Sequence, residues 1–407
     1  MEIVIKLERL LTLLLIAGVV AILTRRFRVP YSIGLVVAGI ILSLFPFFSD
    51  ISFTKDLIFN VFLPPLVFEA AMLIRWKELR RDLPVILTLA TVGVCLSAGL
   101  TALGMRYLVG WEWISALLFG ALIAATDPVS VIATFKEAGV HGRLRLLVEA
   151  ESLLNDGTAA VAFTVILAAA AGSTPSISGI AGKLVVSVAG GVLCGGLIAG
   201  IMLLLAGRTQ DYLVEFSFTT VAAYGSFLLA EHFHSSGVLA SLTAGLLVGN
   251  LGVLGSISPR GREAVTAYWE YLGFIANSFI FIIIGIHLSR QDFTSVLVPA
   301  IIAIVIVTLG RAVAVYPSCA VFARSALRVK GKHQGVLFWG GLRGALALAL
   351  ALGLPPEIPH SEAILVVSFA VVAFSIFVQG LTMTPLLRRI GEISPLNDNR
   401  EPTEIHK

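Results

Sequence analysis

The sequence has 407 residues, of which 57% are hydrophobic and only 13% are charged, and it carries a formal net charge of +4. Soluble domains have roughly 45–50% apolar and about 25% charged residues, so the composition excludes a soluble protein and predicts an all-α integral membrane protein. A small basic excess is explained by charged loops at one membrane face, and we expect no nucleic-acid partner.

Apolar stretches long enough to cross a hydrocarbon core of about 30 Å recur along the whole chain. The first of them leads into Arg25 and Arg26 without a small-residue cleavage site, which favours a transmembrane helix over a signal peptide. Cys95, Cys194 and Cys319 are widely spaced in apolar surroundings, so we expect packing residues and no metal site. We predict thirteen transmembrane helices, near 8–24, 30–46, 56–74, 84–108, 112–135, 146–171, 178–207, 212–231, 236–253, 268–288, 295–323, 335–354 and 362–387.

The charges in the predicted loops indicate the orientation of the chain. If the N-terminus lies outside, most of the 29 Lys and Arg residues fall in the cytoplasmic loops and few fall in the outer ones. Lys and Arg accumulate on the cytoplasmic side of membrane proteins. The pattern therefore predicts an external N-terminus and a cytoplasmic C-terminus.

Acidic residues occur inside the third and fifth predicted spans. Glu69 lies in LPPLVFEA, where it either lines an ion path or reaches the water at the cytoplasmic end of its span. The fifth span contains TDPVSV, where Pro128 removes a backbone donor and crowds the turn that holds Thr126 and Asp127. We therefore expect the fifth helix to be interrupted beside a buried charge.

The sixth predicted span, 146–171, contains the polar motif ESLLNDG in an otherwise apolar segment. Residues three and four apart share one face of a helix, which places Glu151 with Asn155 and Ser152 with Asp156. A carboxylate near the bilayer midplane costs several kcal/mol, so the motif predicts a cation or proton site. A polar contact between helices is the alternative, and it explains Ser152 and Asn155 but not two acids.

Two arginines lie inside the last predicted spans. Arg311, in span 11, needs a carboxylate partner, and Glu151 is the candidate. Arg343 stands among the glycines of GGLRGALALAL in span 12, where we expect a second interruption. Asp127 and Arg343 then carry opposite charges on the two interrupted helices and are expected to offset the dipoles of the half-helices.

Irregular backbone at membrane depth is tolerated only where it is buried in protein or lines a wet cavity. Interrupted spans in corresponding places of two halves indicate a transporter built from inverted repeats, with its binding site near the midplane. We predict that spans 4–6 and 11–13 are the related units, and that spans 5 and 12 are unwound where they cross.

Taken together, LPPLVFEA, TDPVSV, ESLLNDG, GRAVAVYP and GGLRGALALAL resemble the motifs of sodium/proton antiporters of the NhaP and NHE type. The resemblance covers the whole membrane part of the chain, with the motifs in the same order. It implies an NhaA-like fold and a homodimer with a membrane domain at 1–390 and a short cytoplasmic tail at 391–407. Within the membrane domain it implies a dimerisation part at 1–83 and 175–290 and a core part at 84–174 and 291–390.

The resemblance also implies roles for the buried residues, carried over by motif position. Asp156 would bind the cation and the proton in turn, with Asn155 beside it. Ser152 and Thr126 would add oxygen ligands to Na⁺ at Asp156. Asp127 would support the place where the two unwound helices cross, and Glu69 would line the ion path. Glu151, Arg311 and Arg343 would form the structural core.

From these observations we predict a secondary transporter in the inner membrane of a prokaryotic cell, not an enzyme, that needs no cofactor. Na⁺ or Li⁺ would exchange for H⁺, one for one, by alternating access and competition for Asp156. A K⁺/H⁺ antiporter stays open, because oxygen ligands without thiols or imidazoles suit any hard monovalent cation. A cation channel is less favoured because the sequence has no TVGYG-like filter. An intramembrane hydrolase is disfavoured because no span contains H-E-x-x-H.

Overall fold

The computed structural model describes residues 2–27, 29–48, 54–127, 131–132, 135, 139–170, 177–252 and 257–392. Within these ranges every regular element is a helix, as the composition predicts. Pro128, to which the sequence assigned the interruption of the fifth span, lies outside the described residues, and so does most of the expected tail at 391–407.

The first half of the chain forms apolar helices, several of which contain a short π-helical turn, and one 3-10 turn; these turns carry the label η. Its elements are α1 (Glu2–Phe27), α2 (Tyr31–Leu42), η1 (Pro46–Phe48), α3 (Lys55–Leu57), η2 (Ile58–Phe62), α4 (Leu63–Leu73), α5 (Trp76–Thr88), η3 (Leu89–Gly93), α6 (Val94–Gly104), η4 (Met105–Val109), α7 (Trp113–Ala124), α9 (Arg143–Ala170) and α10 (Ile177–Ala206).

The second half continues in the same way. Its elements are α11 (Tyr212–Thr220), η5 (Val221–Gly225), α12 (Ser226–His232), α13 (Gly237–Leu251), α14 (Pro259–Leu288), α15 (Leu297–Val321), α16 (Gly331–Trp339), α17 (Ala345–Leu352), α18 (Ser361–Phe374), η7 (Ser375–Gly380) and α19 (Leu381–Arg389).

Nine helical segments of the described chain are long and apolar enough to cross a membrane. Three shorter apolar helices, α2, α7 and α13, stand at other predicted spans. The chain is therefore a multi-pass membrane protein, whereas the count of thirteen spans stays a prediction.

Two predicted helix starts were wrong by more than two turns. A continuous helical segment begins at Trp76 instead of 84, and α14 begins at Pro259 instead of 268. The predicted start of each span is the point where charged residues give way to apolar ones. A helix can begin before that point, because its first turns can hold their charged side chains in water outside the apolar layer. Lys77, Arg80 and Arg81, assigned to a loop, therefore lie on α5.

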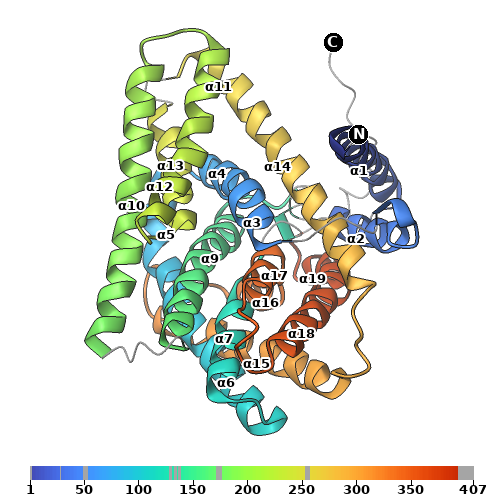
Figure 1. Cartoon of the computed structure of the whole chain (residues 1–407). Helices are drawn as coiled ribbons and strands as arrows, with labels where there is room; N and C mark the ends of the chain where they lie inside the picture. Colours follow the sequence, from blue (N-terminus) through green and yellow to red (C-terminus); the bar gives the residue numbers. More distant parts are fainter. Residues whose placement is uncertain are drawn as a thin grey trace.

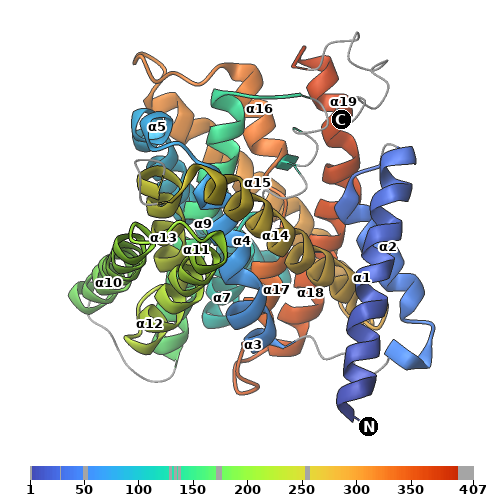
Figure 2. The same ribbon diagram turned by 90° about the horizontal axis from the view of Figure 1, so that it is seen from above.

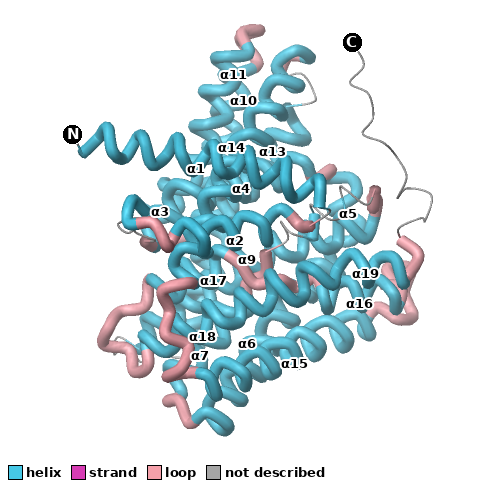
Figure 3. Tube along the Cα trace, turned by 90° about the vertical axis from the view of Figure 1, so that its right-hand side faces the viewer, coloured by secondary structure: helices cyan, strands magenta, loops and turns pink. Residues whose placement is uncertain are grey.

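The helices form two layers, which Figure 3 shows one above the other. One layer, here called the wall, contains α1 to α4 and α10 to α14, with α14 running between α2 and the bundle of α10 to α13 (Figures 1 and 2). The other layer, here called the core bundle, contains α5 to α7, α9 and α15 to α19. Helix α9 contacts α5 and α7 of the core bundle and α4, α10 and α13 of the wall, so it is a helix of the core bundle that faces the wall.

Glycines bring the wall helix α4 close to α13. A side chain at Gly245 or Gly249 would collide with the backbone of Phe68 or Met72 on α4. On the other side of α4 the ring of Phe68 packs on Trp269 of α14, with 4.3 Å between ring centroids. These contacts set the position of the helix that carries Glu69.

Arg143, the first residue of α9, ties this helix to two other parts of the core bundle. Its guanidinium donates to the buried carboxylate of Asp82 on α5, at 2.8 Å from Nε to Oδ1. It also donates to the carbonyls of Leu327 and Arg328, at 2.7 and 2.8 Å, in the connection between α15 and α16. The helix that carries the ESLLNDG motif is thus anchored at its first turn.

Candidate functional site

Two helices of the core bundle end at the same place in the interior. Helix α7 ends at Ala124 and is followed by extended residues 125–127, and residues 340–344 separate α16 from α17. The two interruptions are joined, because the amide of Asp127 donates to the carbonyl of Leu342 at 2.8 Å. Backbone groups that lose their helical partners here find partners on the opposite segment.

Charged side chains lie at the helix ends that the interruptions create. The buried guanidinium of Arg343 donates to the carbonyls of Ala124 and Ala125, at 2.8 and 3.1 Å, at the C-terminus of α7. The carboxylate of Asp127 lies against Gly344, directly before the N-terminus of α17. A cation at a helix C-terminus and an anion at a helix N-terminus both offset the helix dipole.

Asp156 lies deep in the protein beside the interruption of α7, with only 9% of its surface exposed. The amide of Thr126 donates to Oδ1 of Asp156 at 3.2 Å. This amide is available because Thr126 lies two residues beyond Ala124, where α7 ends. The hydroxyl of Thr126 donates to that of Ser152 at 3.1 Å, so oxygens of Thr126, Ser152 and Asp156 gather at one point between α7 and α9.

Glu151 faces Arg311 on the neighbouring side of α9. Arg311 Nη1 donates to Oε1 at 2.7 Å and Nη2 to Oε2 at 2.9 Å, and both side chains are buried. The guanidinium also donates to the carbonyl of Leu337 on α16. The pair packs against Gly341, where a β-carbon would collide with the guanidinium.

Asn155 links this pair to the Asp156 side of α9. Its amide nitrogen donates to Oε1 of Glu151 at 3.3 Å, which fixes the orientation of the side chain. Its buried Oδ1 atom has no hydrogen-bond partner among the described residues. A buried amide oxygen without a donor is unusual, and it could accept a hydrogen bond or ligate a cation.

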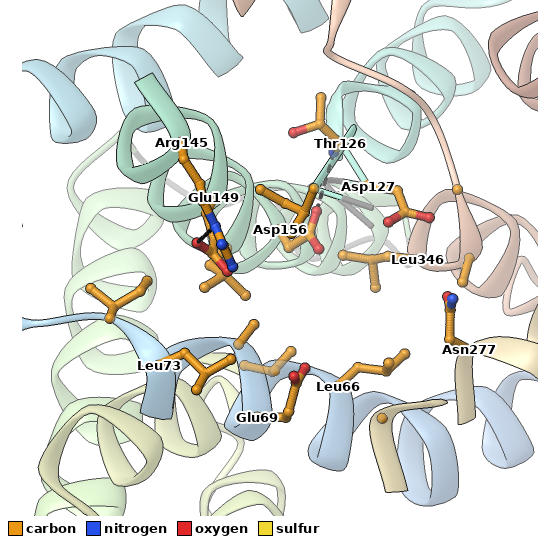
Figure 4. Close-up of a pocket in the computed structure, with 18 of the residues that line it drawn as sticks. Leu66, Glu69, Leu73, Thr126, Asp127, Arg145, Glu149, Asp156, Asn277 and Leu346 are labelled. Carbon is orange, nitrogen blue, oxygen red and sulfur yellow. Dashed lines mark hydrogen bonds and ion pairs between the residues drawn. The ribbon is translucent and has the colours of Figure 1, made fainter. Parts of the chain in front are cut away.

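A cavity of about 970 Å³ separates the wall from the core bundle and reaches Asp156. Figure 4 shows Asp156, Thr126 and Asp127 on its core side and Leu66, Glu69 and Leu73 of α4 on its wall side. Its outer part is lined by exposed residues, namely Arg75, Glu78, His141 and Glu270.

Glu69 and Glu149 lie on opposite sides of this cavity. Glu69 points from α4 into it and rests against Gly273 of α14, which leaves space for the carboxylate (Figure 4). Glu149 pairs with Arg145 at 3.6 Å, and it is buried in the cavity lining.

The cavity also contains a residue that the sequence analysis missed. Asn277 of α14 lines it opposite Asp127 and Leu346 (Figure 4). A single amide in an apolar helix forms no motif and carries no charge that demands a partner, so no sequence signal identified it. In the part of the chain that the structure describes, no group of three or more His, Cys, Asp and Glu side chains is arranged to hold a metal ion.

A family model described as sodium/hydrogen exchanger, transmembrane, matches residues 11–389. The Na⁺/H⁺ antiporter ApNhaP of Aphanothece halophytica is 37% identical over 386 residues, covering 93% of this chain and 73% of that protein. The Na⁺/H⁺ antiporter NhaP of Pseudomonas aeruginosa is 36% identical over 354 residues, covering 84% and 83%.

The structure of the sodium proton antiporter MjNhaP1 from Methanocaldococcus jannaschii at pH 8 matches with a TM-score of 0.75. Its sequence is 21% identical, and the match covers 96% of this chain and 100% of that one. This likeness shows that the two chains share a fold.

Proposed function

The chain belongs to the sodium/hydrogen exchanger family, and from this premise we propose that it exchanges Na⁺ for H⁺ across a membrane, with both ions competing for Asp156. The observation that carries the proposal is the buried carboxylate of Asp156 at the end of a cavity, beside the oxygens of Thr126 and Ser152. Oxygen donors of this kind suit a hard monovalent cation.

Competition for one carboxylate explains why the two ions are coupled. A charged carboxylate at this depth is unfavourable, and either a proton or a cation can neutralise it, but not both together. The occupied site can change its exposure from one side of the membrane to the other, whereas the empty charged site cannot do so readily. Each turnover therefore moves one ion in each direction.

The charges around the two interruptions support an exchange of one cation for one proton. When ionised, the half-buried Asp127 and the buried Glu151 and Asp156 carry three negative charges, and the buried Arg311 and Arg343 carry two positive ones. One bound Na⁺ or H⁺ makes the group neutral, and a second one would leave it positive. Asn155 adds an amide and no charge at the position next to Asp156.

The proposed transport cycle is alternating access between the wall and the core bundle. We assign the interruptions at 125–127 and 340–344 to the unwound crossing of two inverted repeats. Arg75 and Arg145 at the mouth of the cavity belong to regions that the charge pattern places in the cytoplasm, so the cavity represents the inward-facing state.

The domain division, the homodimer, the thirteen spans and the inner-membrane location are parts of the same proposal. The dimerisation part (1–83 and 175–290) corresponds to the wall, and the core part (84–174 and 291–390) to the core bundle. We propose the first boundary in the turn before α5, because this helix begins at Trp76 and not near residue 84.

The test is ion flux in proteoliposomes with an imposed pH gradient, with Na⁺, Li⁺ and K⁺ offered in turn. We expect proton movement that requires Na⁺ or Li⁺ and saturates with its concentration. Proton movement with K⁺ but not with Na⁺ or Li⁺ would contradict the proposal and indicate a K⁺/H⁺ antiporter. Flux that rises linearly with cation concentration and needs no counter-ion would indicate a channel.

A further inference from the structure

Asn277 is a buried amide that faces the cavity without a hydrogen-bond partner. The residue is only 8% exposed, it lines the cavity, and its side chain makes no hydrogen bond with any described residue. Its polar atoms do not belong to the buried side-chain atoms without a partner in the described chain, so they open onto the cavity, where a hydrated ion can reach them. The neighbouring Ser278 shows the opposite case, since its hydroxyl bonds to Tyr31 at 2.8 Å. Asn277 is thus placed to bind something that enters the cavity.

Asn277 places an amide on the wall side of the cavity, on the helix that also faces Glu69. Asn277 lies one helical turn after Gly273, the residue that leaves room for Glu69. The wall therefore presents one carboxylate and one amide to the cavity, opposite Asp127 and Asp156 of the core bundle (Figure 4).

A neutral amide has a specific advantage at this place. Its oxygen can replace one water molecule of a cation that loses its hydration shell on the way to Asp156. Unlike a carboxylate, it does not bind a proton at physiological pH and adds no charge to the cavity. The ligand can therefore assist the cation without adding a second proton to the exchange.

We propose that the amide oxygen of Asn277 is a wall-side ligand for the partly hydrated Na⁺ before it reaches Asp156. The inference rests on the proposed Na⁺/H⁺ exchange and adds a residue of α14 to the ion path. It assigns the wall a direct part in cation binding, in addition to Glu69.

The experiment compares Asn277→Ala, Asn277→Asp and the control Ser278→Ala in proteoliposomes. We expect Asn277→Ala to raise the half-saturating Na⁺ concentration at least threefold with little change in maximal rate. Asn277→Asp should lower it, because a charged oxygen attracts the cation more strongly. Ser278→Ala changes a polar group at the same depth of α14 outside the cavity lining, and it should leave half-saturation unchanged.

The opposite directions of the two Asn277 variants separate cation binding from helix packing. A structural defect would change both variants in the same direction or reduce only the maximal rate, and either result would overturn the inference. If Asn277→Ala does not fold, the isosteric Asn277→Asp is the test by itself. A half-saturating Na⁺ concentration that is unchanged or raised in Asn277→Asp would then contradict the ligand role. Wild-type protein without any Na⁺/H⁺ exchange in the same vesicles would instead overturn the proposed function.

Discussion

Arg311 on α15 donates to both carboxylate oxygens of Glu151 on α9, at 2.7 and 2.9 Å, and the same guanidinium donates to the carbonyl of Leu337 on α16. Three helices of the core bundle thus meet at one buried ion pair. The pair lies one turn of α9 before Asn155, whose amide donates to the same carboxylate. We expect that breaking this pair would shift α9 and with it the neighbouring Asn155 and Asp156.

Removing one member of this pair should destabilise the protein strongly. A buried charge without its partner typically costs about 3–5 kcal/mol, so Glu151→Gln or Arg311→Met should lower the thermal unfolding temperature in detergent. The double variant removes both charges and should recover part of the loss, because contacting residues are not additive. Losses that add strictly would contradict a direct interaction between the two side chains.

A side chain at Gly341 should disturb the same pair by sterics alone. The β-carbon of Gly341→Ala would occupy the place of the Arg311 guanidinium, which cannot move without leaving Glu151. We expect lower thermal stability and reduced exchange. Gly335→Ala on α16 is the matched control, because no atom lies within 4 Å of the added carbon. That variant should be neutral or stabilise α16 by up to about 1 kcal/mol.

The pairing of Glu151 with Arg311 followed from the sequence because charges in the middle of an apolar span require partners. The two interruptions were expected for a similar reason: proline beside Asp127 and glycines around Arg343 are unfavourable in the interior of a helix, and each stands next to a charge. Helix starts were less predictable. The charged turns at the start of α5 have the same composition as a loop, and their tertiary contacts, such as those of Trp76 with Asn250 and of Asp82 with Arg143, are not visible in the sequence.

The contents of the cavity were also beyond the sequence. Glu69 left two interpretations open, because its depth on one helix does not reveal which side of that helix faces water. Asn277 gave no signal, since an isolated neutral amide has no periodicity and no charge to balance. The position of both residues in the cavity depends on how the wall packs against the core bundle, and the sequence alone does not reveal this packing.

The contact of Glu392 with Lys332 should add a small stability that depends on pH. The carboxylate lies 2.6 Å from Lys332 and 3.1 Å from His333, and these hydrogen bonds lower the pKa of Glu392. A lowered pKa in the folded state stabilises the protein above the usual Glu value of about 4.3, and the effect is lost as the pH falls below it. Glu392→Gln should therefore unfold slightly earlier than wild type at pH 7, by at most about 1 kcal/mol, with a smaller difference at pH 3.5. A difference that grows on acidification would contradict this sign.

Asp156→Asn should leave a folded protein without exchange. The amide oxygen of the new side chain can still accept the hydrogen bond of Thr126, so the interruption keeps its geometry. It cannot take up a proton or supply the negative charge that holds a cation. We expect wild-type thermal stability or better and no cation-dependent proton flux. Near-normal exchange in this variant would remove Asp156 from the centre of the mechanism.

The last prediction concerns the effect of voltage. Glu151 is held by Arg311, and Asp127 lies at the N-terminus of α17, so Asp156 is the carboxylate of the core whose charge has to change in each cycle. One cation then replaces one proton, and the cycle moves no net charge. Exchange should be insensitive to membrane potential, although one charge that crosses 100 mV gains or loses about 2.3 kcal/mol.

The measurement is the pH gradient at which net Na⁺ flux reverses, with the potential set by K⁺ and valinomycin once K⁺ has been excluded as a substrate. A one-for-one exchanger reverses where the Na⁺ and H⁺ gradients are equal, whatever the potential. A reversal point that shifts with voltage would mean that a second proton is carried. Asp127 and Glu151 are the carboxylates of the core bundle to which we would assign it, and Glu151→Gln would then restore a voltage-independent reversal only if Glu151 were the second carrier.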